Sequence, residues 1–132
     1  ENNAGFKSAH EQADWNAIAG GVVRVDVRAD ESGCDTIWTS PLKVPSVVPK
    51  LSAASGIAYF YSFDLVTDAD GNPTQQWSIV GLDFKTGKQV IKIPTGVGKP
   101  FDNNWASMSI APNGDFYAGM LGGLVQVRPA QK

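Results

Sequence analysis

The chain has 132 residues, 11 Lys and Arg, 13 Asp and Glu, a net charge of -2 and an apolar content of 42%. This length fits one domain, and this composition is typical of a folded chain rather than a disordered one. Without a run of Lys or Arg there is no electrostatic pattern for nucleic-acid binding, and no segment is long and apolar enough for a membrane-spanning helix.

A helical pattern is present near the N-terminus, within the lead-in 1–20. Ser8 and Glu11 have the spacing of a capping box, so we expect a short helix or an irregular loop between Ser8 and Ile18. No signal peptide is visible, and the chain begins with Glu1 rather than Met. We therefore expect the natural translation start to lie elsewhere.

From residue 21 onward the sequence predicts short strands between turns rich in Gly, Pro, Asn and Asp. The main predicted strands are 22–28, 34–39, 57–63, 77–84, 90–93, 105–110, 116–120 and 124–128. Residues 66–72 are expected to form a polar hairpin tip, and residues 94–104 a connection. Strands of this number and length are typical of a β-sandwich, a β-barrel or a β-propeller.

An internal repeat favours the propeller among these three folds. The segments 21–26 (GVVRVD), 78–83 (SIVGLD) and 123–128 (GLVQVR) share one apolar pattern, and the first two lead through a Gly turn to another strand. A strand, a turn and an aromatic strand precede the second and third copies. The repeated unit is therefore a four-stranded antiparallel meander, at the period of roughly 40 to 50 residues expected for propeller blades.

Two segments carry a resemblance to a known family. The segment 82–90 (LDFKTGKQV) resembles the blade motif of quinoprotein-like, PQQ-repeat-like β-propellers, although Val90 stands where that family usually has Trp, and the segment 109–127 resembles a generic propeller repeat. The resemblance implies an all-β fold with about two and a half blades of a β-propeller, as its C-terminal part. The expected blade pieces are about 21–40, 46–94 and 105–128.

This reading implies partners, because a ring needs at least about four blades. We expect the remaining blades to come from the same precursor or from another copy, with a small-molecule ligand also compatible. We expect a binding or scaffold module with no catalytic residues and no evident cofactor. The alternatives are part of a quinoprotein-like oxidoreductase and a small autonomous β-sandwich binding domain. The resemblance and the single cysteine favour a secreted or periplasmic location.

Candidate ligand-binding residues are polar side chains in loops beside predicted strands, together with one aromatic. They are Asn2, Asn3, Asp102, Asn103, Asn104 and Trp105. Polar and aromatic groups at the loop face of a propeller suit a sugar, a peptide or a cofactor. These residues are chosen because Asn and Asp side chains lie beside the starts of predicted strands.

Other motifs favour structural roles. Asp68, Asp70 and Asn72 are the candidates for a metal site, but they lack the rest of a calcium loop and fit a solvated hairpin tip better. His10 has no nucleophile motif nearby, so we expect a solvated side chain. The segment 96–99 (GVGK) lacks phosphate-loop spacing and is expected to be a loop. Cys34 is expected to be a packed or inert thiol.

Overall fold

The computed structural model describes residues 20–45 and 48–130. These residues form nine strands and a short 3-10 helix, η2. The elements are β1 (Val22–Val27), β2 (Cys34–Ser40), β3 (Lys50–Ser52), β4 (Ile57–Thr67), β5 (Pro73–Asp83), β6 (Gln89–Val97), η2 (Lys99–Phe101), β7 (Met108–Ile110), β8 (Phe116–Met120) and β9 (Gly123–Val127). All strand pairs are antiparallel, which confirms the all-β prediction. The helix expected between Ser8 and Ile18 lies outside the described residues.

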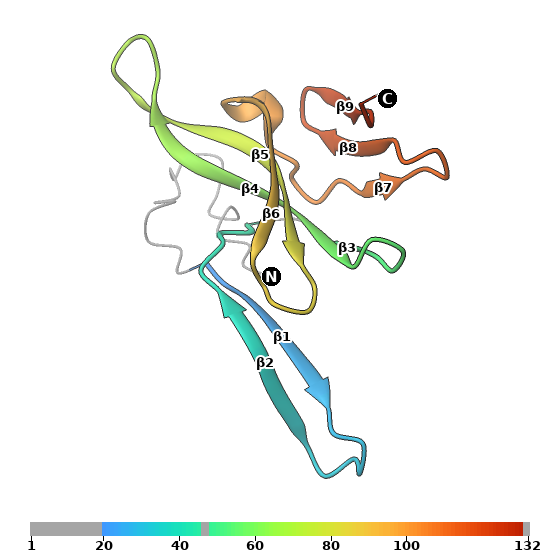
Figure 1. The fold of residues 1–132 in the computed structure, drawn as a ribbon. Helices are drawn as coiled ribbons and strands as arrows, with labels where there is room; N and C mark the ends of the chain where they lie inside the picture. The colour runs from blue at the N-terminus through green and yellow to red at the C-terminus, as the bar shows by residue number, and fades with distance from the viewer. Residues whose placement is uncertain (1–19, 46–47, 131–132) are drawn as a thin grey trace.

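The strands form three separate sheets, in the orders β1-β2, β3-β4-β5-β6 and β7-β8-β9. Figure 1 shows the β1–β2 hairpin projecting from one end and the β7–β9 sheet lying at the other. Each sheet is a meander in which strands consecutive in the chain are neighbours. The repeat predicted two strands for the first copy, four for the second and three for the third, and these numbers are the ones observed.

Several predicted boundaries are wrong because they followed turn residues too closely. The strands β4 and β5 continue to Thr67 and from Pro73, beyond the expected limits, because cross-strand pairing overrides the polar sequence near the tip. The strand β6 runs on through Pro94 to Val97, which an edge strand tolerates. The strand β7 begins only at Met108, because the backbone at Trp105 turns with φ 74°.

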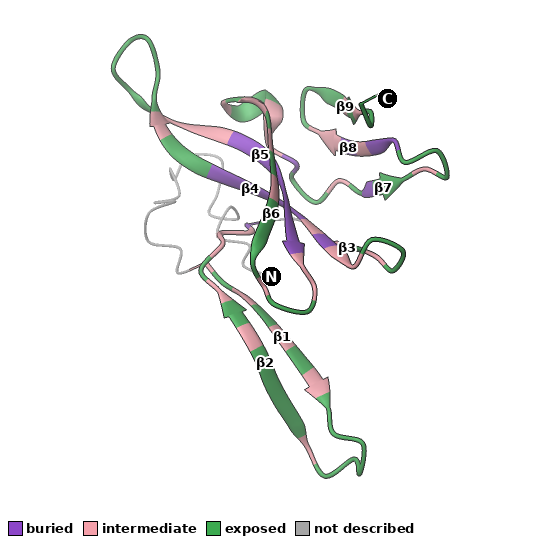
Figure 2. Ribbon diagram, in the orientation of Figure 1, coloured by how far each residue is buried: buried purple, intermediate pink, exposed green. Residues whose placement is uncertain are grey.

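Consecutive residues of β4 and β5 are buried (Figure 2), and because successive side chains of a strand point to opposite faces, the four-stranded sheet is buried on both faces. One face and the β7–β9 sheet form a cluster of buried residues: Tyr61, Phe63, Trp77, Ile79, Met108, Phe116 and Ala118. The opposite face forms a second cluster of Ala58, Phe60, Val80 and Leu82, which packs against Val22 of β1 and Trp38 of β2. The four-stranded sheet therefore lies between the other two sheets.

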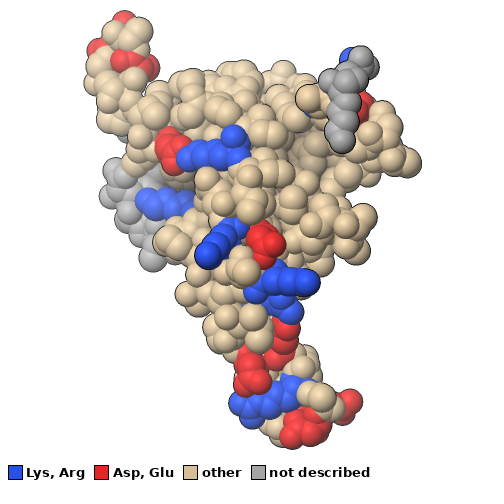
Figure 3. Space-filling model, in the orientation of Figure 1, with Lys and Arg blue, Asp and Glu red and all other residues tan. Residues whose placement is uncertain are grey.

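No helix in the described ranges 20–45 and 48–130 has the length and apolar character that crossing a membrane requires. Figure 3 shows Lys and Arg side chains intermixed with Asp and Glu along the β1–β2 hairpin. Two ion pairs account for part of this pattern, Arg24 with Asp26 and Arg28 with Asp35. The hairpin surface on this face is therefore of mixed charge.

Candidate functional site

The predicted ligand loop, 102–105, follows η2 and leads toward β7. The Oδ1 atom of Asp102 accepts a hydrogen bond of 2.9 Å from the amide of Asn104, and the carbonyl of Asn103 accepts one of 2.8 Å from Ala106. Asn104 and Trp105 have φ values of 38° and 74°. Their left-handed conformation makes this segment a tight turn. Asn2 and Asn3, the other predicted ligand-binding residues, lie outside the described residues.

Asn103 has a structural position rather than an accessible one. The residue is 1% exposed, and its Nδ2 atom donates a 2.6 Å hydrogen bond to the carbonyl of Gly119 in β8. The carbonyl of Asp102 accepts a 2.9 Å hydrogen bond from the amide of Leu121, and Pro100 accepts one of 2.8 Å from Gly122. The loop thus fastens to the β8–β9 turn and connects the second sheet to the third.

The carboxyl group of Asp102 is half-buried in this junction, and burial raises its pKa. Hydrogen bonding from the amide of Asn104 acts in the opposite direction, since it stabilises the carboxylate. Trp105 is 47% exposed. Of the four described candidates, Asn103 is therefore inaccessible to a ligand, while Trp105 presents part of its indole at the surface.

Tyr61 of β4 forms a second connection beneath the same loop. Its hydroxyl donates a 2.9 Å hydrogen bond to the carbonyl of Phe101 and lies 2.6 Å from the hydroxyl of Thr95. Burial raises the pKa of Tyr61 to about 12. Its ring stacks on Trp77 with the ring centres 5.5 Å apart. The hydroxyl is therefore held as a neutral hydrogen-bond donor inside the core.

The hairpin tip contains the three metal candidates. The Oδ1 atom of Asp68 accepts hydrogen bonds from the amides of Asp70, at 3.0 Å, and Asn72, at 2.8 Å. This use of a carboxylate is ordinary turn chemistry. Within the described residues, no group of three or more His, Cys, Asp or Glu side chains is arranged to hold a metal ion. The Asp68 carboxylate thus stabilises the backbone of the hairpin tip.

Two other motifs have mixed outcomes. The segment 96–99 is not wholly a loop: Gly96 and Val97 belong to β6, and Lys99 begins η2. Gly96 is required there, because an added Cβ would lie 2.3 Å from the ring of Phe101.

Cys34 is exposed rather than packed, because it lies at the start of β2 beyond the part of the hairpin that contacts the next sheet. His10 lies outside the described residues.

The contact between the first and second sheets was not predicted from the sequence. The Nε1 atom of Trp38 donates a 2.8 Å hydrogen bond to the carbonyl of Phe84, and its ring touches Gly87 in the β5–β6 turn. Arg24 donates to the same carbonyl at 2.8 Å, and its guanidinium lies 4.1 Å from the centre of the Phe84 ring. In the sequence, only Trp38 of the first copy and the Thr86-Gly87 turn of the second copy indicate this contact.

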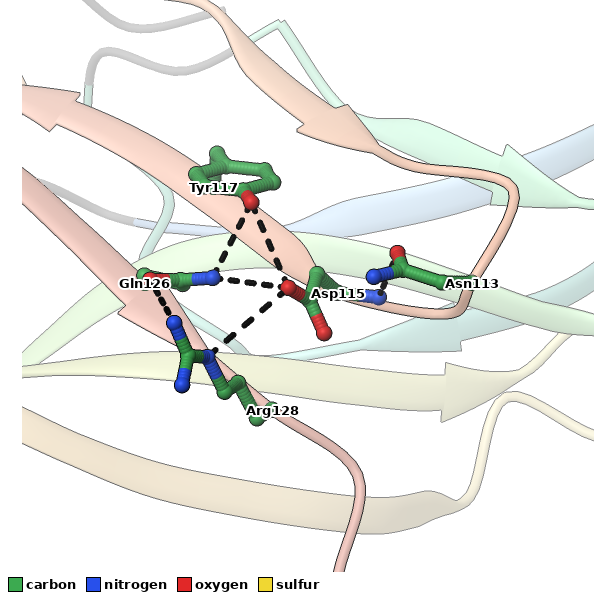
Figure 4. Close-up of polar contacts among 5 residues, drawn as sticks. All are labelled: Asn113, Asp115, Tyr117, Gln126 and Arg128. Carbon is green, nitrogen blue, oxygen red and sulfur yellow. Dashed lines mark hydrogen bonds and ion pairs between the residues drawn. The ribbon is translucent and has the colours of Figure 1, made fainter.

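A polar network covers part of the third sheet (Figure 4). The Oδ2 atom of Asp115 accepts hydrogen bonds from the Nε2 atom of Gln126, at 2.7 Å, and from the hydroxyl of Tyr117, at 3.3 Å. Arg128 lies 3.9 Å from the same carboxylate. Asn113 accepts a 3.1 Å hydrogen bond from the amide of Asp115. The network stabilises the β7–β8 turn against β9, and its Asp115 carboxylate is shielded from solvent.

A hollow of about 330 Å³ lies between β1 and the second sheet. The walls come from β1, from β3, from the second buried face of β4, from Trp38 of β2 and from Phe84 after β5, and they include Arg24, Leu51, Ala58 and Phe60. Most of this lining is apolar. The hollow combines aromatic walls with a charged pair, Arg24 and Asp26, whose hydrogen bonds are made to each other and to Phe84. Such a site suits binding by shape and apolar contact.

Comparison with known proteins identifies no family for this chain. No family model and no solved structure matches it. An uncharacterised protein of Archaeoglobus fulgidus is 22% identical over 107 residues, which make up 81% of this chain and 19% of that protein. The chain thus spans about a fifth of the length of the curated relative that it matches.

Proposed function

We propose that this chain is a section of a β-propeller, about two and a half blades, that serves as a binding or scaffold module. The observation that carries the proposal is the burial of the four-stranded sheet on both faces by sheets of the same meander type. Blades of a propeller pack in this way around an axis. The remaining blades would cover the two outermost sheets.

Equivalent residues of the repeat support this stacking. Val80 of the second copy is 0% exposed against the first sheet, whereas the matching Val23 of the first copy is 56% exposed. Ile79 of the second copy is 1% exposed against the third sheet, whereas the matching Leu124 of the third copy is 66% exposed. Each end of the stack therefore leaves exposed the position that the middle sheet buries.

The alternatives gain no comparable support. The quinoprotein-like oxidoreductase rests on the resemblance of the segment 82–90 alone. A β-sandwich consists of two packed sheets, whereas the described part of this chain stacks three. The proposed function remains a binding or scaffold module, with further blades as the partner and a secreted or periplasmic location as an expectation.

Cross-linking between the two ends tests the proposal. In a Cys34→Ser background, one protein carries Val25→Cys on β1 and another carries Leu124→Cys on β9. The isolated chain has apolar residues exposed at both ends, so mixed disulfides between the two variants should form in excess over either homodimer. Leu65→Cys, an exposed position on β4, is the matched control. Equal yields from the end variants and the control would overturn the proposed stacking.

A further inference from the structure

The outer edge of β1 is an unpaired strand edge beside an apolar hollow. In the described part of the chain, β1 pairs only with β2. The amide of Arg28 donates to the carbonyl of Gly33 at 2.9 Å, so this pair is hydrogen-bonded across the hairpin. Because hydrogen-bonded and non-hydrogen-bonded pairs alternate, the backbone groups of Val27 and Val25 point away from β2. An added strand would find donors and acceptors there.

The second copy of the repeat shows what occupies the equivalent place. The strand β5 matches β1, and β4 lies beside β5 on the side away from β6. Tyr61 of β4 pairs with Ile79, the residue that matches Val22 in the first copy. Tyr59 pairs with Gly81, which matches Arg24. The missing neighbour of β1 would therefore place its own residues opposite Val22 and Arg24.

The size of the hollow follows from one difference between the repeats. Tyr59 reaches the third sheet, where its ring centre lies 5.1 Å from that of Phe116. Ala58 of the second sheet is the equivalent of Phe116 of the third. Ala58 pairs with Leu82 and Phe116 pairs with Val127, and Leu82 and Val127 are matching positions of the repeat. The smaller side chain leaves space where the third sheet has an aromatic ring. A hollow of about 330 Å³ accommodates a large side chain beside Ala58 and Phe60.

The unpaired edge of β1 and the hollow beside it together form a slot between β1 and β4. We propose that this slot binds an extended polypeptide strand, antiparallel to β1, with aromatic side chains at alternate positions. Backbone hydrogen bonds at Val25 and Val27 would hold the strand, and the hollow would select its aromatic side chain. Lys50 lines the slot and has no ion pair with another described residue, so an acidic residue in the strand is favoured. This inference rests on the proposed repeat but concerns a different contact from end-to-end stacking.

A labelled peptide with the sequence of β4, 57–67, tests the slot, because it copies the strand that lies beside β5 and carries Asp64. Fluorescence polarisation measures its binding to the chain, with a polar tag keeping the peptide soluble. The matched control peptide has Tyr59→Ser and Tyr61→Ser. We expect the parent peptide to bind at least tenfold more tightly than this control. Equal binding of the two peptides would contradict aromatic selection.

Two variants of the chain separate backbone pairing from pocket contact. Val25→Pro removes an outward amide, and Leu51→Glu places a charge in the apolar slot at a half-exposed position. Both should weaken the peptide at least tenfold, while Leu124→Glu, an exposed leucine on β9, should not. Binding that survives Val25→Pro, in a variant with unchanged circular dichroism, would exclude strand addition. Peptide failure with end-to-end cross-linking intact would remove the slot and leave the proposed function.

Discussion

Trp38 of β2 and Gly87 of the β5–β6 turn touch so closely that a Cβ added to the glycine would lie 2.6 Å from the indole ring. Gly87 also has φ 71°, a conformation that side chains with a Cβ rarely adopt. These residues are 49 positions apart in the sequence. One contact therefore joins a strand of the first sheet to a turn of the second.

Gly87→Ala should destabilise the chain by about 2 to 4 kcal/mol, because backbone strain and overpacking against Trp38 act together. Urea unfolding followed by tryptophan fluorescence measures this change. Gly56→Ala is the matched control, since Gly56 has φ 67° and nothing within 4 Å of the added Cβ. The control should cost only about 1 kcal/mol. Equal losses from both variants would show that Trp38 does not pack on the turn.

Asn103→Ala should lower the free energy of unfolding by about 1 to 3 kcal/mol, because it leaves the carbonyl of Gly119 without its side-chain donor in a buried place. The expected effect is on stability, since Asn103 is inaccessible to a ligand. Asn72→Ala, at an exposed position in the hairpin tip, should change stability by less than about 0.5 kcal/mol. An Asn103→Ala variant as stable as the parent would argue against this junction between the sheets.

Acid should weaken the β5–β6 turn through Asp83. Hydrogen bonds from the hydroxyl and the amide of Thr86, both 2.8 Å, lower the pKa of this carboxyl. Because the pKa of Asp83 is lower in the folded chain than in the unfolded chain, its carboxylate stabilises the fold at pH values above the unfolded pKa of about 3.9. This stabilisation disappears as the pH falls through the pKa of the folded state. Thr86→Val should therefore be less stable at pH 7 and lose less on acidification. Parallel denaturation midpoints from pH 7 to pH 3 would contradict the prediction.

Alkali should act on Tyr61, whose pKa is raised by burial to about 12. An unfolded tyrosine ionises near pH 10, so the neutral buried form contributes fully below about pH 10 and the contribution disappears as pH rises toward the folded value. Tyr61→Phe should cost about 1 kcal/mol at pH 8 through the lost hydrogen bond to Phe101. The deficit should shrink by pH 11. A deficit that stays constant over this range would exclude the shift.

Local sequence signals predicted the sheets well. Alternation in residues 22–27 and the Gly turns located the strands, and the three copies of one apolar pattern gave the correct strands per sheet. Boundaries failed where cross-strand pairing decided the outcome. Thr67 and Pro73 pair with each other despite lying in a segment whose composition favours a loop.

The candidate site was harder to predict, because accessibility depends on tertiary packing. Asp102 and Asn103 have the composition of a binding loop, yet Asn103 is buried by the β8–β9 turn, which comes later in the chain. The hollow beside β1 arises from Ala58 and Trp38, which no short motif connects. Comparing equivalent repeat positions recovers part of this information. It shows which face of each sheet needs a neighbour.

The native mass of the purified chain, measured by light scattering over a range of concentrations, tests the central proposal of an incomplete propeller most directly. With Val23 and Leu124 exposed at opposite ends of the stack, the mass should rise above the 14.0 kDa of one chain as concentration increases. Val23→Lys combined with Leu124→Lys should return it toward that of a monomer. A parent chain that stays a folded 14.0 kDa monomer at every concentration would contradict the account and favour sheets that close on themselves.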